Sequence, residues 1–152
     1  MRISTKADYA VRAALELATA AEDNPVKGAD LARRQEIPLQ FLEHILLEMK
    51  HARLIKARRG ARGGYWLARP AGEITVADVI RAVEGPLANI HESAPEDLRY
   101  EGAAERLRDV WVAVRHNLRA VLESVTLEQL AKGHLPWKID AMLNDPQTWH
   151  KR

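Results

Sequence analysis

A cationic stretch between residues 51 and 70 is the part of this chain whose side chains best suit a charged partner. The chain has a formal net charge of only +2, but this stretch holds six basic residues and no acid. Its centre is the turn Arg59-Gly60-Ala61-Arg62-Gly63. Glycines let a backbone approach a surface closely, and an arginine on a narrow tip suits the minor groove of DNA. The stretch therefore predicts a polyanion partner, with a solvated basic loop as the alternative.

A second group of polar side chains precedes this stretch, on the outer face of an expected helix at 38–51. The buried face of that helix is predicted from apolar residues at helical spacing: Phe41, Leu42, Ile45, Leu46 and Met49. On the exposed face, Gln40 can pair with adenine, and Glu43 can accept a hydrogen bond from cytosine. His44 belongs to the same face. These side chains equally suit the solvated face of an ordinary amphipathic helix, so the helix alone does not decide between the two interpretations.

The helices and strands that must position these side chains are predicted from helix-capping residues, from the spacing of apolar residues and from the glycines and prolines that end regular structure. At 152 residues and 47% hydrophobic, the chain can bury a core. Two short strands, 54–58 and 64–68, are expected to form a hairpin around the glycine-rich turn. Helices are expected at 4–21, 29–35, 38–51, 76–84, 103–124 and 127–131, with caps at Ser4 or Thr5, Thr75 and Thr126. This order predicts a mainly α fold with a small β-hairpin wing, a winged helix-turn-helix plus a long C-terminal dimerisation helix.

Double-stranded DNA is the polyanion that fits this arrangement. The helix at 38–51 would enter the major groove and the hairpin tip the minor groove, while basic residues elsewhere would hold backbone phosphates. The residues expected to contact DNA are Arg2, Lys6, Gln40, His44, Lys56, Arg58, Arg59, Gly60 and Arg62. The alternative is a winged-helix protein-interaction module without specific DNA binding.

The expected helix at 103–124 carries an apolar seam. Its apolar residues step by three and four, as in a heptad repeat, and Trp111 is expected to anchor the same face. With one small core beneath it, the seam predicts a partner helix and hence a homodimer, while packing on the chain's own N-terminal domain is the alternative. The residues expected in this contact are Leu107, Val110, Trp111, Val114, Leu118, Val121 and Val125.

Several motifs of residues 1–85 together resemble the Rrf2 family of winged-helix transcriptional regulators. They are MRISTK…YAVRA at 1–13, I…FLE…IL at 37–46, RG…GGY…L at 59–67 and ITVADVI…VEG at 74–85. The resemblance implies a homodimer on a pseudo-palindromic promoter site, usually as a repressor. It also implies that the residues matching Gln40, His44 and Arg59 reach DNA, and that Asp8 matches a position where some members supply a carboxylate ligand to an iron–sulfur cluster.

The absence of cysteine separates this chain from the cluster-binding members of that family. Those members place three cysteines in the loop that corresponds to 87–107, and this chain has none. One carboxylate without thiolates should not hold such a cluster, so the chain resembles the cluster-free branch and no cofactor is expected. Some cluster-free members serve sulfur or cysteine metabolism, and that role is the expectation here. A small-molecule or protein effector stays open, with Asp8, His91 and Tyr100 as candidate contacts.

Other functions are not expected. The acidic and histidine residues between 91 and 116 lack a regular ligand spacing, so no metal site is predicted. The sequence motifs of nucleotide-binding, serine and zinc enzymes are missing. No apolar run is long enough to span a bilayer and no signal peptide is evident, which predicts a cytoplasmic protein without a membrane partner. The expected units are a DNA-binding domain (1–85), a regulatory loop (86–102), dimerisation helices (103–134) and a C-terminal tail (135–152).

Overall fold

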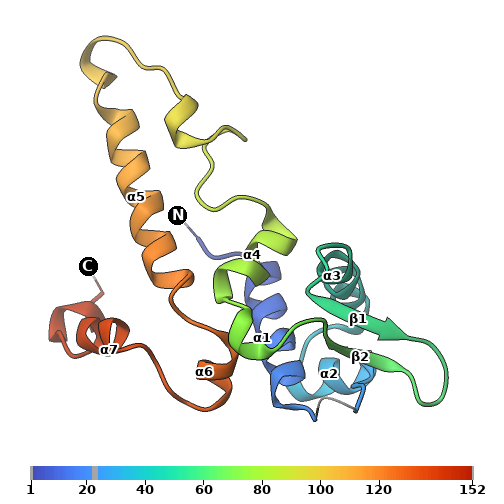
Figure 1. The fold of residues 1–152 in the computed structure, drawn as a ribbon. Helices are drawn as coiled ribbons and strands as arrows, with labels where there is room; N and C mark the ends of the chain where they lie inside the picture. Colours follow the sequence, from blue (N-terminus) through green and yellow to red (C-terminus); the bar gives the residue numbers. More distant parts are fainter. Residues whose placement is uncertain (1, 22–23, 152) are drawn as a thin grey trace.

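The computed structural model describes residues 2–21 and 24–151. Met1 of the opening motif and residues 22–23, where the first helix was expected to break, lie outside this part. Within it the fold is mostly helical with one two-stranded antiparallel hairpin, which confirms the predicted fold class (Figure 1). The elements are α1 (Thr5–Thr19), α2 (Gly28–Gln35), α3 (Leu39–His51), β1 (Ile55–Arg58), β2 (Gly64–Leu67), α4 (Val76–Glu84), α5 (Leu107–Leu122), α6 (Leu127–Ala131) and α7 (Trp137–Leu143), with short 3₁₀ turns η1 (Ala71–Glu73), η2 (Pro95–Asp97), η3 (Gly102–Ala104) and η4 (Pro146–Trp149).

Helix α1 lies at the centre of the body and contacts α2, α3, α4, α6 and β2. Its buried face consists almost entirely of alanines, which let the neighbouring helices approach closely. The helix begins as predicted at Ser4, whose Oγ accepts a hydrogen bond from the N–H of Ala7 at 3.0 Å. It ends at Thr19, two residues before the expected end.

The core is built from all the elements that surround α1. Its largest fully buried side chains are Leu31, Leu42, Ile45, Leu46, Met49, Ile55, Ile74, Val79 and Leu127. Leu127 comes from α6, so the C-terminal half of the chain contributes to the same core as the N-terminal half. The expectation that Phe41 is a core residue is wrong. Phe41 is 40% exposed, because its ring packs edge-on against Tyr9 at the rim of the body, with 5.7 Å between the ring centres.

Two predicted capping residues join the halves of the chain. Thr75 and Thr126 each cap a helix, α4 and α6, through a complete capping box. The backbones beside these caps pair in an antiparallel bridge: the N–H of Val76 donates to Val125 at 2.9 Å, and the N–H of Leu127 donates to Ile74 at 2.9 Å. The lower end of α5 is thereby fixed to the body.

Helix α5 rises away from the body, with the segment that precedes it running alongside (Figure 1). The helix begins at Leu107 rather than near residue 103, after the turn η3, and none of its 16 residues is fully buried. Beyond α6, where no order was predicted, the chain forms α7 and η4, which pack on each other. No helix in the described part of the chain is long and apolar enough to cross a membrane.

Candidate nucleic-acid interface

A three-residue turn sets the angle between α2 and α3. Glu36 takes a left-handed backbone conformation with φ of 53°. Ile37 is buried, and its N–H donates to the carbonyl of Ala32 at 2.9 Å. Pro38, expected within the first turn of the helix, instead occupies the capping position before α3. The turn therefore fixes one face of α3 on the core and leaves the opposite face uncovered.

The uncovered face of α3 carries the predicted base-contacting side chains. Gln40, Glu43 and His44 are all exposed, opposite the buried Leu42, Ile45, Leu46 and Met49. Sequence reasoning missed Leu47, which is 49% exposed on the same face. Its position three residues after His44 was the signal that could have identified it, because residues three or four apart lie on one helix face. We use "outer stripe" for the line of Gln40, His44, Leu47 and His51.

The hairpin of β1 and β2, which we call the wing, is held to the body by its second strand. The strands pair from Ile55 with Leu67 to Arg58 with Gly64. Tyr65 also exchanges two backbone hydrogen bonds with Val26, of 2.8 and 2.9 Å. This close approach requires glycine at position 64, because an added Cβ would lie 2.7 Å from the carbonyl oxygen of Val26. The base of the wing is thus fixed relative to α2 and α3.

The tip of the wing presents arginines in two different states. The guanidinium of Arg58 donates to the carbonyl of Arg62 at 3.0 Å and braces the turn. Gly60, with φ of 103°, accepts from the N–H of Gly63 at 2.9 Å. Arg59 is exposed, and within the described residues its side chain has no hydrogen bond or ion pair. Among the described residues, the guanidinium of Arg59 is therefore left without a partner at the wing tip.

Three of the predicted DNA contacts, Lys56, Lys6 and Arg2, lie outside the wing tip and α3 and have different surroundings. Lys56 is exposed on β1. Lys6 pairs with Glu48 of α3 at 2.9 Å, so its charge is already partly neutralised. Arg2 is exposed at the other side of the body, next to α4. The structure thus brings Gln40, His44, Lys56 and the wing arginines onto two adjoining elements, and it separates Arg2 from them. The DNA contacts themselves stay predictions.

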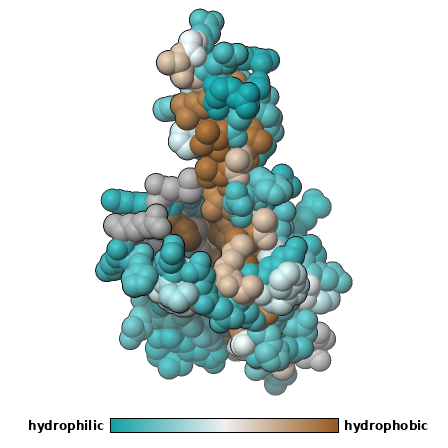
Figure 2. Space-filling view, turned by 90° about the vertical axis from the view of Figure 1, so that its left-hand side faces the viewer, coloured by the Kyte–Doolittle hydropathy of each residue, from teal (hydrophilic) through white to brown (hydrophobic). Residues whose placement is uncertain are grey.

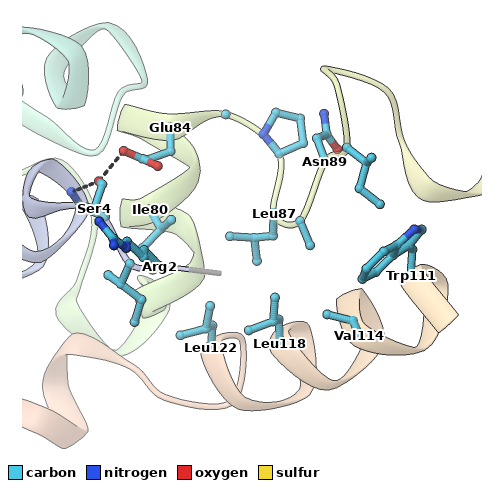
Figure 3. Close-up of a pocket in the computed structure, with 16 residues that line it drawn as sticks. Arg2, Ser4, Ile80, Glu84, Leu87, Asn89, Trp111, Val114, Leu118 and Leu122 are labelled. Atoms are coloured by element: carbon cyan, nitrogen blue, oxygen red, sulfur yellow. Dashed lines mark hydrogen bonds between the residues drawn. The ribbon is translucent and has the colours of Figure 1, made fainter.

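A groove of about 610 Å³ lies between α5 and the body. Trp111, Val114, Leu118 and Leu122 form its α5 wall. The opposite side is lined by Ile80 and Glu84 of α4 and by Leu87 and Asn89 of the loop that follows (Figure 3). At one end of the groove, the hydroxyl of Ser4 donates a hydrogen bond to the carboxylate of Glu84. Apolar surface continues along the length of α5 (Figure 2). Below we call this cavity the α4–α5 groove.

The seven seam residues lie at three depths. Val110 is 50% exposed. Leu107, Trp111, Val114, Leu118 and Val121 are half-buried, and three of these line the α4–α5 groove. Val125 is only 6% exposed, because the chain's own α4 and α6 region covers it. It therefore stabilises the protomer and is not available to a partner.

The candidate effector residues do not converge. Asp8 is paired with Arg12 at 3.3 Å, and His91 is exposed in the loop after α4. Tyr100 lines a separate hollow with Arg99 and Glu105, apart from the α4–α5 groove. In the described ranges, no three His, Asp or Glu side chains come together as metal ligands.

Comparison with known proteins connects these features with one family. The sequence model of Rrf2, described as "Iron-dependent Transcriptional regulator", matches residues 3–133. Rv1287 of Mycobacterium tuberculosis is 48% identical over 145 residues, which are 95% of this chain and 90% of that protein. The HTH-type transcriptional regulator CymR of Bacillus subtilis is 35% identical over 131 residues, covering 86% of this chain and 90% of CymR.

Solved structures agree with the sequence comparison. The structure of CymR, titled the global cysteine regulator of B. subtilis, superposes with a TM-score of 0.74 at 32% identity and covers 89% of this chain and 99% of that one. IscR of T. potens has a TM-score of 0.70 at 30% identity and covers 99% and 97%. The likeness to IscR covers almost the whole chain, so this chain shares the overall fold of these two regulators.

Proposed function

This chain belongs to the Rrf2 family of DNA-binding transcriptional regulators, and from that premise we propose that it represses transcription by binding a pseudo-palindromic promoter site as a homodimer. The observation that carries the proposal is the pairing of two uncovered elements, the outer face of α3 and the wing. Gln40 and His44 would contact base edges in the major groove, and Arg59 would enter the adjoining minor groove. Lys56, Arg58 and Arg62 would hold the backbone phosphates.

Charge supports DNA rather than protein as the partner of these elements. Residues 51–70 contain no acid, and the wing tip is exposed. A polyanion surface would neutralise this charge and release counterions, so the affinity should fall steeply with salt. A protein-binding module needs no such uncompensated charge at a narrow tip.

Selection of bound fragments from the source genome, followed by salt titration of the best site, tests the proposal. We expect one enriched inverted repeat, with half-sites about one helical turn apart, and a log–log salt slope of several units. Transcription of a template that carries the site should fall when the protein is added. No enriched sequence, or a flat salt response, would refute the DNA function and favour the protein-interaction module.

A second copy of the chain is the proposed cover for α5. The helix has 16 residues and buries none of them fully, yet its apolar side chains follow a heptad spacing. Exposed apolar surface on this scale is unfavourable in water, and a two-fold pair of α5 helices would cover it. The two copies would then present two α3 helices to successive turns of one DNA face.

Two valines on opposite faces of α5 make a matched test of the homodimer. Val110, on the seam, is 50% exposed, and Val112, on the polar face, is 37% exposed. Neither is buried in the protomer, so glutamate at either position should leave the fold intact. We expect Val110→Glu to yield monomers in light scattering and Val112→Glu to keep the mass of the wild type. Equal masses for both variants would refute the seam.

We propose that the protein works without an iron–sulfur cluster, although the family model is described as iron-dependent. The chain offers no cysteine thiolate, and Asp8 is engaged by Arg12, so the donor set does not fit such a cluster. The purified protein should bind its site without iron and stay colourless after anaerobic reconstitution. The likeness to CymR, the global cysteine regulator of B. subtilis, supports a role in sulfur or cysteine metabolism. The identity of the genes next to the selected fragments would test that role. It would also suggest which small molecule or protein to test as an effector.

A further inference from the structure

We propose that Leu47 recognises the C5 methyl group of a thymine in each half-site. The proposal rests on the DNA-binding function proposed above and names a specificity-determining contact within it. Gln40 and His44 are polar and can recognise base edges through hydrogen bonds. Leu47 has no polar group, so its contribution to sequence choice must come from apolar contact.

The position of Leu47 on α3 is fixed by the packing of the helix. The buried residues Leu42, Ile45, Leu46 and Met49 define the inner face. The outer stripe, whose members are spaced by four, three and four residues, lies directly opposite. Leu47 is therefore aligned with Gln40 and His44, one turn further along the same line. If the stripe lies in the major groove, Leu47 faces base edges with them.

The exposure of Leu47 is not explained by packing within the chain. Phe41 is similarly exposed, but its ring packs against Tyr9. Glu48, beside Leu47, turns toward α1 and pairs with Lys6. Leu47 has no such role: half of its side chain is open to solvent at the centre of the outer face. A single exposed leucine is ordinary on a protein surface, but one aligned with base-contacting side chains is placed to select a base.

Thymine is the base whose chemistry matches an aliphatic side chain. Its C5 methyl is the only methyl group, and the largest apolar group, that the four natural bases present in the major groove. Contact with Leu47 would remove both groups from water. Loss of one buried methyl is worth about fourfold in affinity, so loss from both half-sites of a palindrome should weaken binding about fifteenfold.

Replacement of thymine by deoxyuridine isolates this methyl group, because the two bases differ by nothing else in the groove. The selected operator would be synthesised with each symmetry-related pair of thymines replaced in turn, and affinities measured by fluorescence anisotropy. The wild type should show one pair whose replacement weakens binding about fifteenfold. Leu47→Asn should bind the thymine and deoxyuridine forms at that pair equally, while Leu47→Met should keep the difference.

Leu39→Asn is the matched control, since Leu39 is 42% exposed on the same helix but lies off the outer stripe. It should keep the deoxyuridine effect at the pair assigned to Leu47. Absence of any sensitive pair in a wild type that binds its operator would overturn this inference alone. A sensitive pair that persists in Leu47→Asn would do the same. Failure of the wild type to bind any specific DNA would instead overturn the proposed function, and this inference with it.

Discussion

Substitution of Arg59 by alanine should separate DNA binding from folding. The side chain is exposed at the wing tip and makes no hydrogen bond or ion pair within the described residues. Arg58 differs, because its guanidinium braces the turn through the carbonyl of Arg62. Surface substitutions of this kind usually change the free energy of unfolding by less than about 0.5 kcal/mol. Arg59→Ala should therefore unfold at the same denaturant concentration as the wild type.

The expected loss of DNA affinity is much larger. A hydrogen bond to a charged group contributes about 1.5–3 kcal/mol, and a homodimer would lose two such contacts. The combined loss of about 3–6 kcal/mol corresponds to a weakening of roughly a hundredfold to ten-thousandfold. Each arginine that neutralises phosphate charge adds about 0.9 to the salt slope, so the slope should become shallower by about 1.8.

Fluorescence anisotropy with a labelled operator at four or five potassium chloride concentrations measures both quantities. Arg106→Ala is the control, because it removes the same charge from a side chain that is 88% exposed on the other half of the chain, where it pairs with Asp109. Arg106→Ala should bind DNA like the wild type. If Arg59→Ala kept both its affinity and its salt slope, the assignment of the wing tip to the minor groove would be wrong.

Two further predictions concern how α5 is attached to the body. Glu123 is bonded to Arg81 of α4 and, at 3.0 Å, to Arg119. The hydrogen bond from Arg81, and to a lesser extent that from Arg119, holds the pKa of the Glu123 carboxyl below its ordinary value. The stabilisation is therefore present above the pKa of the unfolded chain, about 4.3, and is lost as the pH falls through the lower folded-state value. Glu123→Gln should lower the Tm at pH 7 and should match the wild type in strong acid; a difference in Tm that is constant with pH would contradict this account. Leu127→Ala should lower the free energy of unfolding by about 2–5 kcal/mol in urea titrations. Leu127 lies in the C-terminal half of the chain, but its side chain is fully buried in the core that both halves share. Leu130→Ala, at a half-buried site on the same helix, should cost clearly less, and equal losses would contradict the reasoning that burial in the core makes Leu127 the more important of the two.

Local features of the fold were predictable because local chemistry specifies them. A hydroxyl before an apolar periodic run fixes a helix start, and Ser4, Thr75 and Thr126 all cap the helices assigned to them. Glycines between two strand-like runs fix a hairpin, and the wing pairs over nearly the expected residues. On these grounds both elements of the candidate DNA interface could be placed from the sequence.

Contacts between distant segments were not predictable in the same way. Val125 fits the heptad spacing of α5, but the bridge between the starts of α4 and α6 buries it inside the protomer. Phe41 has the helical spacing of a core residue, but the core ends before it and Tyr9 covers only one edge of its ring. Leu47 was overlooked for a different reason. Its spacing placed it on the outer face, but an apolar side chain was not considered among groups that could recognise a base.

The attachment of α5 determines how the two DNA-binding surfaces of the proposed homodimer are spaced. The backbone bridge at Thr75 and Thr126 joins the start of α4 to the start of α6, and Arg81 bonds to Glu123 beside it. The lower end of α5 is thus fixed to the same core that carries α3. In a two-fold dimer formed along α5, the separation of the two α3 helices then depends on the angle between α5 and the body. The α4–α5 groove lies between α5 and the body, along this angle.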